Sequence, residues 1–165
     1  MSFGQSIYAG MRHAALNKEL YDGCCFRLYD TTVNGSIIYP ADPSKAVIGT
    51  LLAIVTVGGG NTGITWVTPT DNVLYKTPGE LWEEDSILAS GPVTYLRLSS
   101  LIDDGTERTD LARFAFKAGT YSQYENDIAQ NGFSLITARF ANTTLVAGQP
   151  FRISTAQITS VLSIT

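Results

Sequence analysis

The sequence predicts a mainly β protein, an antiparallel β-sandwich or jelly-roll-like domain that follows one N-terminal α-helix. Three observations predict this class. The 15 Gly residues and a charged fraction of only 16%, against about 25% in an average soluble domain, favour short strands and turns over helices. Short apolar segments alternate with turn-forming residues along most of the chain. The length of 165 residues suits a single domain, residues 1–165, with its own core.

Helical periodicity is present at the start of the chain, over about residues 4–20. Ile7, Met11 and Ala14 or Ala15 recur at steps of three and four, which gives one apolar face. Asp22-Gly23 then forms a turn that ends the helix. The β-rich body is expected from about residue 24 to residue 165.

The first predicted strands lie directly after this helix. Phe26 and Leu28 alternate with a polar residue in the strand of residues 24–30. Residues 31–49 contain several turn formers and predict a long ordered loop, which in a compact domain usually interacts or functions. The continuous apolar run of residues 50–57 predicts a strand that is buried on both faces.

Later strands are short and are separated by turn signals. They are predicted at residues 64–68, 73–76, 93–98, 111–118, 133–140, 144–146, 151–154 and 158–164. Alternation within them places these side chains on the core face: Leu96, Leu98, Phe114 and Phe116. It places these charged side chains on the outer face: Arg97, Arg113 and Lys117. The polar residues 119–132 predict a loop or a short helical turn.

The charge pattern argues against nucleic acid and membrane partners. The net charge is −4 and the 11 Lys and Arg residues are scattered singly, whereas phosphate binding needs clustered cations. No apolar stretch approaches the roughly 18–20 residues of a membrane span. The N-terminal residues lack a basic segment followed by a continuous apolar one, so a secretory signal is not expected.

Cys24 and Cys25 are adjacent in a predicted strand. Neighbouring strand residues point to opposite faces, so a disulfide between them would be strained. Two buried or half-buried thiols are the favoured interpretation, and a disulfide between molecules of an assembly is the alternative.

The residues for common catalytic or cofactor sites are incomplete. His13, the single histidine, is expected to be exposed or to face a partner, which leaves a catalytic triad or a histidine-rich metal site without its other members. The run from Gly58 to Gly63 resembles a phosphate loop, but the residues that follow are strand-like and offer no helix N-terminus. We therefore expect a hairpin there, and no enzyme activity, catalytic residue, cofactor or metal.

Two groups of side chains leave alternatives open. The densest acidic group contains Glu80, Glu83, Glu84 and Asp85, and further acidic residues are Asp103, Asp104 and Asp110. A solvated sheet edge is the favoured interpretation, and a small hydrolase would require these carboxylates to converge on a cleft. Trp66, Trp82 and the eight Tyr residues are expected in the core. Together on the surface they would instead indicate a carbohydrate-binding adhesion module.

A series of short stretches occurs in a characteristic order along nearly the whole chain. They are the N-terminal helix, Phe26-Arg27-Leu28-Tyr29-Asp30, Pro40-Ala41-Asp42, Gly49-Thr50-Leu51-Leu52-Ala53, Gly58-Gly59-Gly60, Gly63-Ile64-Thr65-Trp66, Ala89-Ser90-Gly91, Tyr95-Leu96-Arg97-Leu98, Thr144-Leu145-Val146-Ala147-Gly148-Gln149 and the closing apolar strand. This order resembles a family of small structural proteins encoded among the virion genes of tailed phages. The chain departs from the family pattern at residues 34–39 and at residues 121–131.

The resemblance implies a structural role in the phage particle, without cofactors or catalytic residues. A head decoration or cement protein that stabilises the capsid is the first expectation, and a neck, collar or tail component is the alternative. The implied partners are other virion proteins, such as the major capsid protein or a neck or tail protein, and further copies of the chain. The protein would be made in the host cytoplasm and located in the virion. The N-terminal helix would pack on the domain or serve as a docking element.

Overall fold

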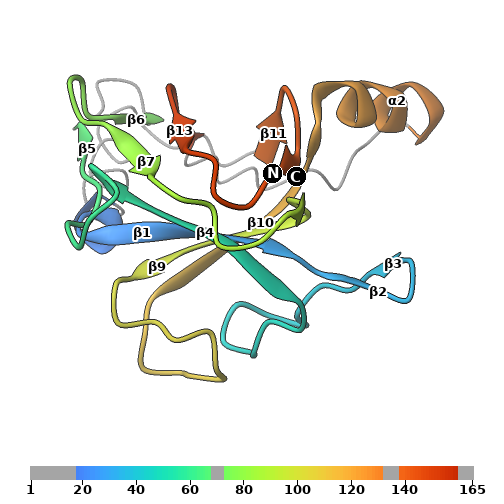
Figure 1. Cartoon of the computed structure of the whole chain (residues 1–165), viewed down its shortest axis with the longest axis horizontal. Helices are drawn as coiled ribbons and strands as arrows, with labels where there is room; N and C mark the ends of the chain where they lie inside the picture. The colour runs from blue at the N-terminus through green and yellow to red at the C-terminus, as the bar shows by residue number, and fades with distance from the viewer. Residues whose placement is uncertain (1–17, 68–72, 132–137, 160–165) are drawn as a thin grey trace, which may run out of the picture.

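A seven-stranded sheet forms the centre of the computed structural model, which describes residues 18–67, 73–131 and 138–159 (Figure 1). Its strand order is β11 (Ala138–Phe140), β10 (Arg113–Thr120), β9 (Tyr95–Ser100), β1 (Cys24–Asp30), β4 (Thr50–Val57), β7 (Trp82–Glu84) and β13 (Phe151–Ile153). Neighbouring strands are antiparallel except β10 and β11, which are parallel. The mainly β prediction is confirmed.

Three smaller sheets surround the central one. One contains β14 (Gln157–Thr159), β6 (Val73–Lys76) and β5 (Trp66–Val67). The others are the pairs β12 (Thr144–Leu145) with β8 (Gly91–Pro92) and β2 (Thr32–Val33) with β3 (Ser36–Ile37). The predicted strands at residues 24–30, 50–57 and 73–76 have the predicted bounds.

The apolar core lies between one face of the central sheet and the sheet of β14, β6 and β5. Trp66 of β5 and Trp82 of β7 meet at its centre, with ring centroids 4.9 Å apart in an edge-to-face arrangement. Phe26 of β1 lies 6.2 Å from the first ring and 6.0 Å from the second. Both tryptophans are fully buried, so the core prediction for them is confirmed. Aromatic packing of this kind joins the two sheets into one cluster.

A helix after β10 differs from the prediction of one N-terminal helix. α2 (Tyr121–Asn131) follows β10 directly, and the chain then returns to place β11 parallel to β10. Its first turn is capped reciprocally: Gln123 N–H donates to Thr120 Oγ1 at 3.1 Å, and Thr120 N–H donates to Gln123 Oε1 at 2.7 Å. This capping box satisfies backbone donors that a helix start leaves unpaired. The strands are therefore mixed rather than purely antiparallel.

The predicted N-terminal helix lies mostly outside the described residues, as does His13. Residues 18–21 are helical, and Asp22 N–H donates to Lys18 O at 2.8 Å. Gly23 follows with φ of 78°, so the chain turns into β1 at the predicted place.

The predicted loop of residues 31–49 contains a hairpin. Strands β2 and β3 pair around Asn34-Gly35, whose φ angles are 49° and 79°. Two consecutive positive φ angles are typical of the tight turn that joins hairpin strands. The hairpin projects from the sheet in Figure 1.

Two arginines that were predicted to point outward are buried. Arg97 is 0% and Arg113 is 7% exposed, while Leu96 and Leu98 lie in the core as predicted. The side chains alternate between the two faces of the sheet as predicted. The second face, however, is covered by the loops of residues 38–49 and 101–112 (Figure 1). Arg108 N–H of one loop donates to Ser44 O of the other at 2.9 Å. Both faces of the central strands are therefore buried.

Candidate functional site

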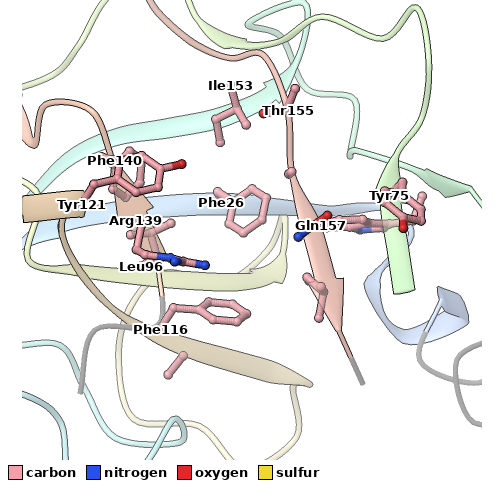
Figure 2. Close-up of a pocket in the computed structure, with 15 residues that line it drawn as sticks. Phe26, Tyr75, Leu96, Phe116, Tyr121, Arg139, Phe140, Ile153, Thr155 and Gln157 are labelled. Carbon is pink, nitrogen blue, oxygen red and sulfur yellow. The ribbon is translucent and has the colours of Figure 1, made fainter. Parts of the chain in front are cut away.

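A cavity with a volume of about 940 Å³ lies beside β14 (Figure 2). Phe26, Leu96 and Phe116 of the central sheet form one wall. The other walls come from residues of β5, β6, β11, β13, β14 and the start of α2: Trp66, Tyr75, Ala138, Phe140, Ile153, Ile158 and Tyr121. Aromatic rings thus dominate a cavity of the size that small ligands or short peptide segments occupy.

Arg139 brings a positive charge into this cavity. Its guanidinium carbon lies 4.5 Å from the ring centre of Tyr124 and 5.8 Å from that of Tyr121. Stacking on aromatic faces orients a guanidinium without neutralising it. Within residues 18–67, 73–131 and 138–159, Arg139 forms no ion pair with a carboxylate.

Trp66 contributes its indole ring to the cavity wall. The residue is 1% exposed, and its indole Nε1–H has no hydrogen-bond partner among the described residues. A buried donor without a partner costs free energy. Gln157 and Thr155 add side-chain amide and hydroxyl groups at the rim. Arg139 carries the charge among the described lining residues, so the site favours a ligand that accepts hydrogen bonds from a guanidinium.

Strands at the edges of their sheets border the cavity. In the described residues β11 and β13 are the outer strands of the central sheet, and β14 is an outer strand of the three-stranded sheet. Phe140 of β11 and Phe151 of β13 have ring centroids 6.5 Å apart, so the curled sheet brings its two ends together here. In Figure 2, β14 has Phe26 and Phe116 on one side and Tyr75 of its partner β6 on the other.

No family model, curated protein or solved structure matches this chain.

A second unusual group is the buried arginine cluster, which consists of Arg27, Arg97, Arg113 and Asp103. All four residues are less than 10% exposed. Arg113 forms a bidentate pair with Asp103, with N–O distances of 2.9 and 2.6 Å. Burial by itself raises the pKa of Asp103, but hydrogen bonds from Arg113, Gly105 and Ser99 outweigh it, and the pKa lies below the usual carboxyl value.

The arginines of this cluster hold the covering loops on the sheet. Arg27 donates to the backbone oxygens of Ser100 and Leu101, each at 2.9 Å. Arg97 Nη2 donates to Lys45 O at 2.7 Å, and Arg113 Nη1 donates to Ser44 O at 2.9 Å. Arg97 Nη1 lies 3.9 Å from Asp103 Oδ2. The cluster therefore has a structural role in joining loops that are distant in sequence.

The predicted acidic group does not converge on a cleft. Glu80 accepts hydrogen bonds from Thr65 and from Trp82 Nε1. Burial raises its pKa, and these bonds, with the charge of a nearby lysine, lower it to a net value below the usual range. Glu83 pairs with Arg152 at 2.6 Å. Each carboxylate thus stabilises a different strand connection.

The remaining acidic residues also have local partners. Glu84 accepts from Ile54 N–H at 3.0 Å, and the Asp85 carboxylate lies next to Gly59. Asp104 accepts from Thr106 in a turn, and Asp110 pairs with Arg108 at 2.6 Å. The carboxylate arrangement that a hydrolase requires is not formed by these side chains.

The glycine run forms a turn, as predicted. Val57 N–H donates to Thr62 O at 2.9 Å across it, and Gly58 and Gly59 have φ angles of 64° and 65°. The next element is the strand β5. A helix N-terminus that could attract a phosphate does not follow the run.

Both cysteines are buried free thiols, as predicted. Burial raises the pKa of each to about 11. Arg27 Nη1 donates to Cys25 Sγ at 2.9 Å. The pKa values keep both groups as thiols at neutral pH, in which form they are poor nucleophiles and poor metal ligands.

Three further findings concern metal binding, membrane-spanning helices and carbohydrate binding. In the described ranges, no three His, Cys, Asp or Glu side chains gather in a way that could hold a metal ion. Among the same residues, every helix is too short or too polar to cross a membrane. The exposed tryptophan surface that a carbohydrate-binding module would use is not formed, because Trp66 and Trp82 are buried.

Sequence reasoning missed Arg139 and Gln157 as cavity residues. Each lies in a three-residue strand with no local motif. Their role depends on how the ends of the curled sheet meet, and alternation within a strand carries no such information.

Proposed function

We propose that the protein is a structural, non-enzymatic component of a tailed-phage particle, and specifically a head decoration or cement protein. The observation that carries the proposal is a set of exposed aliphatic side chains on the projecting hairpin and on the loops that cover the sheet. Ile37 is 50%, Ile48 62% and Ile102 67% exposed. Exposed apolar side chains on projecting segments are available for protein–protein contacts.

The positions in the fold of the stretches that resemble the phage family support this proposal. The stretches 26–30, 49–53 and 95–98 fall on β1, β4 and β9, the central strands that determine the fold. The departure at residues 34–39 falls on the projecting hairpin, where a change of partner would be accommodated. On a capsid lattice, many copies of one subunit each make weak contacts, and together these contacts stabilise the particle strongly.

We include in the proposal the finer description of the fold as a jelly-roll-like sandwich. Trp66 of β5, Leu74 of β6 and Ile158 of β14 belong to the same core as Phe26 and Leu96 of the central sheet, which supports two facing layers. An experimental structure that includes residues 1–17, 68–72, 132–137 and 160–165 tests it, with two sheets packed face to face expected.

Symmetry-resolved electron cryomicroscopy of the particle tests the location. A decoration protein is expected at repeated positions over the head. Density at one vertex or along the tail would favour the neck, collar or tail alternative instead. Absence of the chain from purified particles would contradict a virion role altogether.

The exposed hairpin provides a direct test of the contact surface. We expect the double substitution Ile37→Asp and Ile38→Asp to reduce binding to particles at least tenfold, because it places two charges in an apolar contact. The free protein should keep its thermal stability, since both side chains are exposed. Ser36→Asp is the matched control on the same hairpin and should bind almost normally. Unchanged binding by the double variant would show that the hairpin is not a contact.

A further inference from the structure

The cavity beside β14 has the features of a site for an extended polypeptide segment. We propose that it binds a strand of another protein chain, by pairing with the edge of β14 that no strand of the described residues occupies. The bound segment would place apolar side chains in the aromatic cavity and a carboxylate beside Arg139. This inference rests on the cavity alone and goes beyond the virion assignment.

The first step in the argument is the backbone of β14. Its residues pair with β6 on one side, from Gln157 opposite Tyr75 to Thr159 opposite Val73. The other side faces the cavity in Figure 2. In an antiparallel strand, alternate residues direct N–H and C=O groups to opposite sides. A strand edge that lacks a neighbour, as this one does among the described residues, is a template for an added strand, and peptide-binding domains use such edges in this way.

The second step is the apolar character of the cavity. An added strand directs every second side chain to one face. The rings of Phe26, Phe116 and Phe140 line the cavity beside β14. Apolar side chains at alternate positions of the bound segment would be removed from water there, which is the main favourable term in such complexes.

The third step is charge and hydrogen bonding. Arg139 points into the cavity in Figure 2 and has aromatic neighbours but no carboxylate partner in the described residues. An Asp or Glu on the bound segment would pair with the guanidinium. An alternating apolar segment with one acidic residue therefore fits the site.

A peptide array tests this inference on the intact chain. The probes are immobilised seven-residue peptides in which Val, Ile, Leu or Phe alternate with Thr, and one position carries Asp, Ser or Lys. Binding of the fluorescently labelled protein is expected on the Asp series and at least tenfold weaker on the Lys series. Arg139→Glu should reverse this preference. No binding to any series, or a preference that Arg139→Glu leaves unchanged, would overturn the proposal.

Arg152→Glu is the matched control. Arg152 lies on β13 next to Ile153, which lines the cavity, so alternation directs its side chain to the other face, where it pairs with Glu83. The control should keep the wild-type preference for Asp. Equal effects of the two substitutions would attribute the preference to net charge and contradict a specific site.

Backbone pairing is tested separately with N-methylated peptides. Two versions of the probe peptide are made, with methyl groups on the odd-numbered or on the even-numbered backbone nitrogens. Each version blocks hydrogen bonding along one edge of the peptide strand. Strand addition predicts that one version loses at least tenfold in binding and the other does not. Equal binding of both versions would overturn strand addition.

A photo-cross-linking residue in place of Thr155, at the exposed rim, identifies competing occupants. Cross-links to the bound peptide are expected. Cross-links that form only to residues 1–17 or 160–165 of the same molecule would show that the chain covers its own cavity. Cross-linking of the protein to a second copy of itself would give covalent dimers. If added peptide does not reduce the yield of these covalent dimers, the cavity is a self-association site. Either result would overturn the proposal.

Discussion

Cys24 and Cys25 illustrate how burial controls chemistry at single residues. Cys25 is 0% and Cys24 5% exposed, and their pKa values are raised to about 11, chiefly by desolvation. Only the thiolate reacts quickly with disulfide reagents. The adjacent thiols are therefore protected although a charged arginine contacts one of them.

We expect neither cysteine to react rapidly with a thiol-specific disulfide reagent at pH 8 in the folded protein. Two thiols should react rapidly once the chain is unfolded in guanidinium, which provides the control. Absorbance of the released thiolate measures both rates. Rapid labelling of the folded protein would contradict the burial described for β1.

Asp103 is the residue on which the buried arginine cluster depends most. Asp103→Asn removes the negative partner of Arg113 and leaves an uncompensated buried charge. We expect a loss of about 3–5 kcal/mol in the free energy of unfolding, measured by denaturant titration. The matched control is Asp110→Asn, which affects an exposed pair with Arg108 and should change stability little. Equal losses would contradict the structural role of the cluster.

The pH dependence of stability provides a second measurement at Asp103. Its folded pKa is lowered, so the contribution is fully present above the unfolded value of about 3.9. This contribution is lost as the pH falls from that value through the folded pKa. The wild type should therefore lose more stability than Asp103→Asn in this acidic range. Parallel pH profiles would contradict the lowered pKa.

Gly63 shows how one position constrains two elements. A side-chain Cβ at Gly63 would lie 2.2 Å from the backbone carbon and oxygen of Gly23, the residue that ends the N-terminal helix. Ile64 N–H donates to Cys24 O at 2.8 Å beside it. The start of β1 and the segment before β5 therefore pack backbone against backbone.

We expect Gly63→Ala to destabilise the protein by about 3 kcal/mol, because the neighbouring backbone must move to relieve the clash. Gly60→Ala lies in the same turn and meets no atom closer than 4.0 Å, so it should change stability little. Thermal unfolding of both variants measures the difference. Similar melting temperatures would show that the two segments can separate without cost.

The helix α2 shows what local signals can and cannot predict. Thr120 and Gln123 have the spacing of a capping box, so a helix start could have been found from the sequence. The residues that follow are polar, and they give no apolar face of the usual width. The polar pattern therefore predicts only a loop or a short helical turn there, although the first turn of α2 is stabilised locally.

The elements best predicted from sequence are those whose burial follows from their own residues. β1 and β4 have their predicted bounds because alternation and β-branched runs determine them locally. The outward prediction for Arg97 and Arg113 was wrong because two distant loops cover that face. The cavity beside β14 depends on the meeting of sheet ends that are far apart in sequence. The hydrophobic pattern within single strands contains no information about which distant sheet ends come into contact.

At the scale of the whole molecule, the two tryptophans join the central and three-stranded sheets in one core. We expect one cooperative unfolding transition, in which far-UV circular dichroism and tryptophan fluorescence give the same midpoint. The fluorescence should start at short wavelength, since both rings are buried, and shift to long wavelength in the same step. A temperature or denaturant concentration at which one signal has changed and the other has not would show that the sheets unfold separately.

The position of β1 in the middle of the sheet determines when the protein can begin to fold. Its neighbours are β4 and β9, and Cys24 pairs with Ser100. A ribosome that adds about 5–20 residues per second needs several seconds to make the second neighbour after the first strand has emerged. During this interval one edge of an apolar strand is unpaired, and pairing across such long loops is intrinsically slow. We therefore expect yield in the cell to depend on chaperones or low temperature more strongly than the stability of the finished fold would suggest.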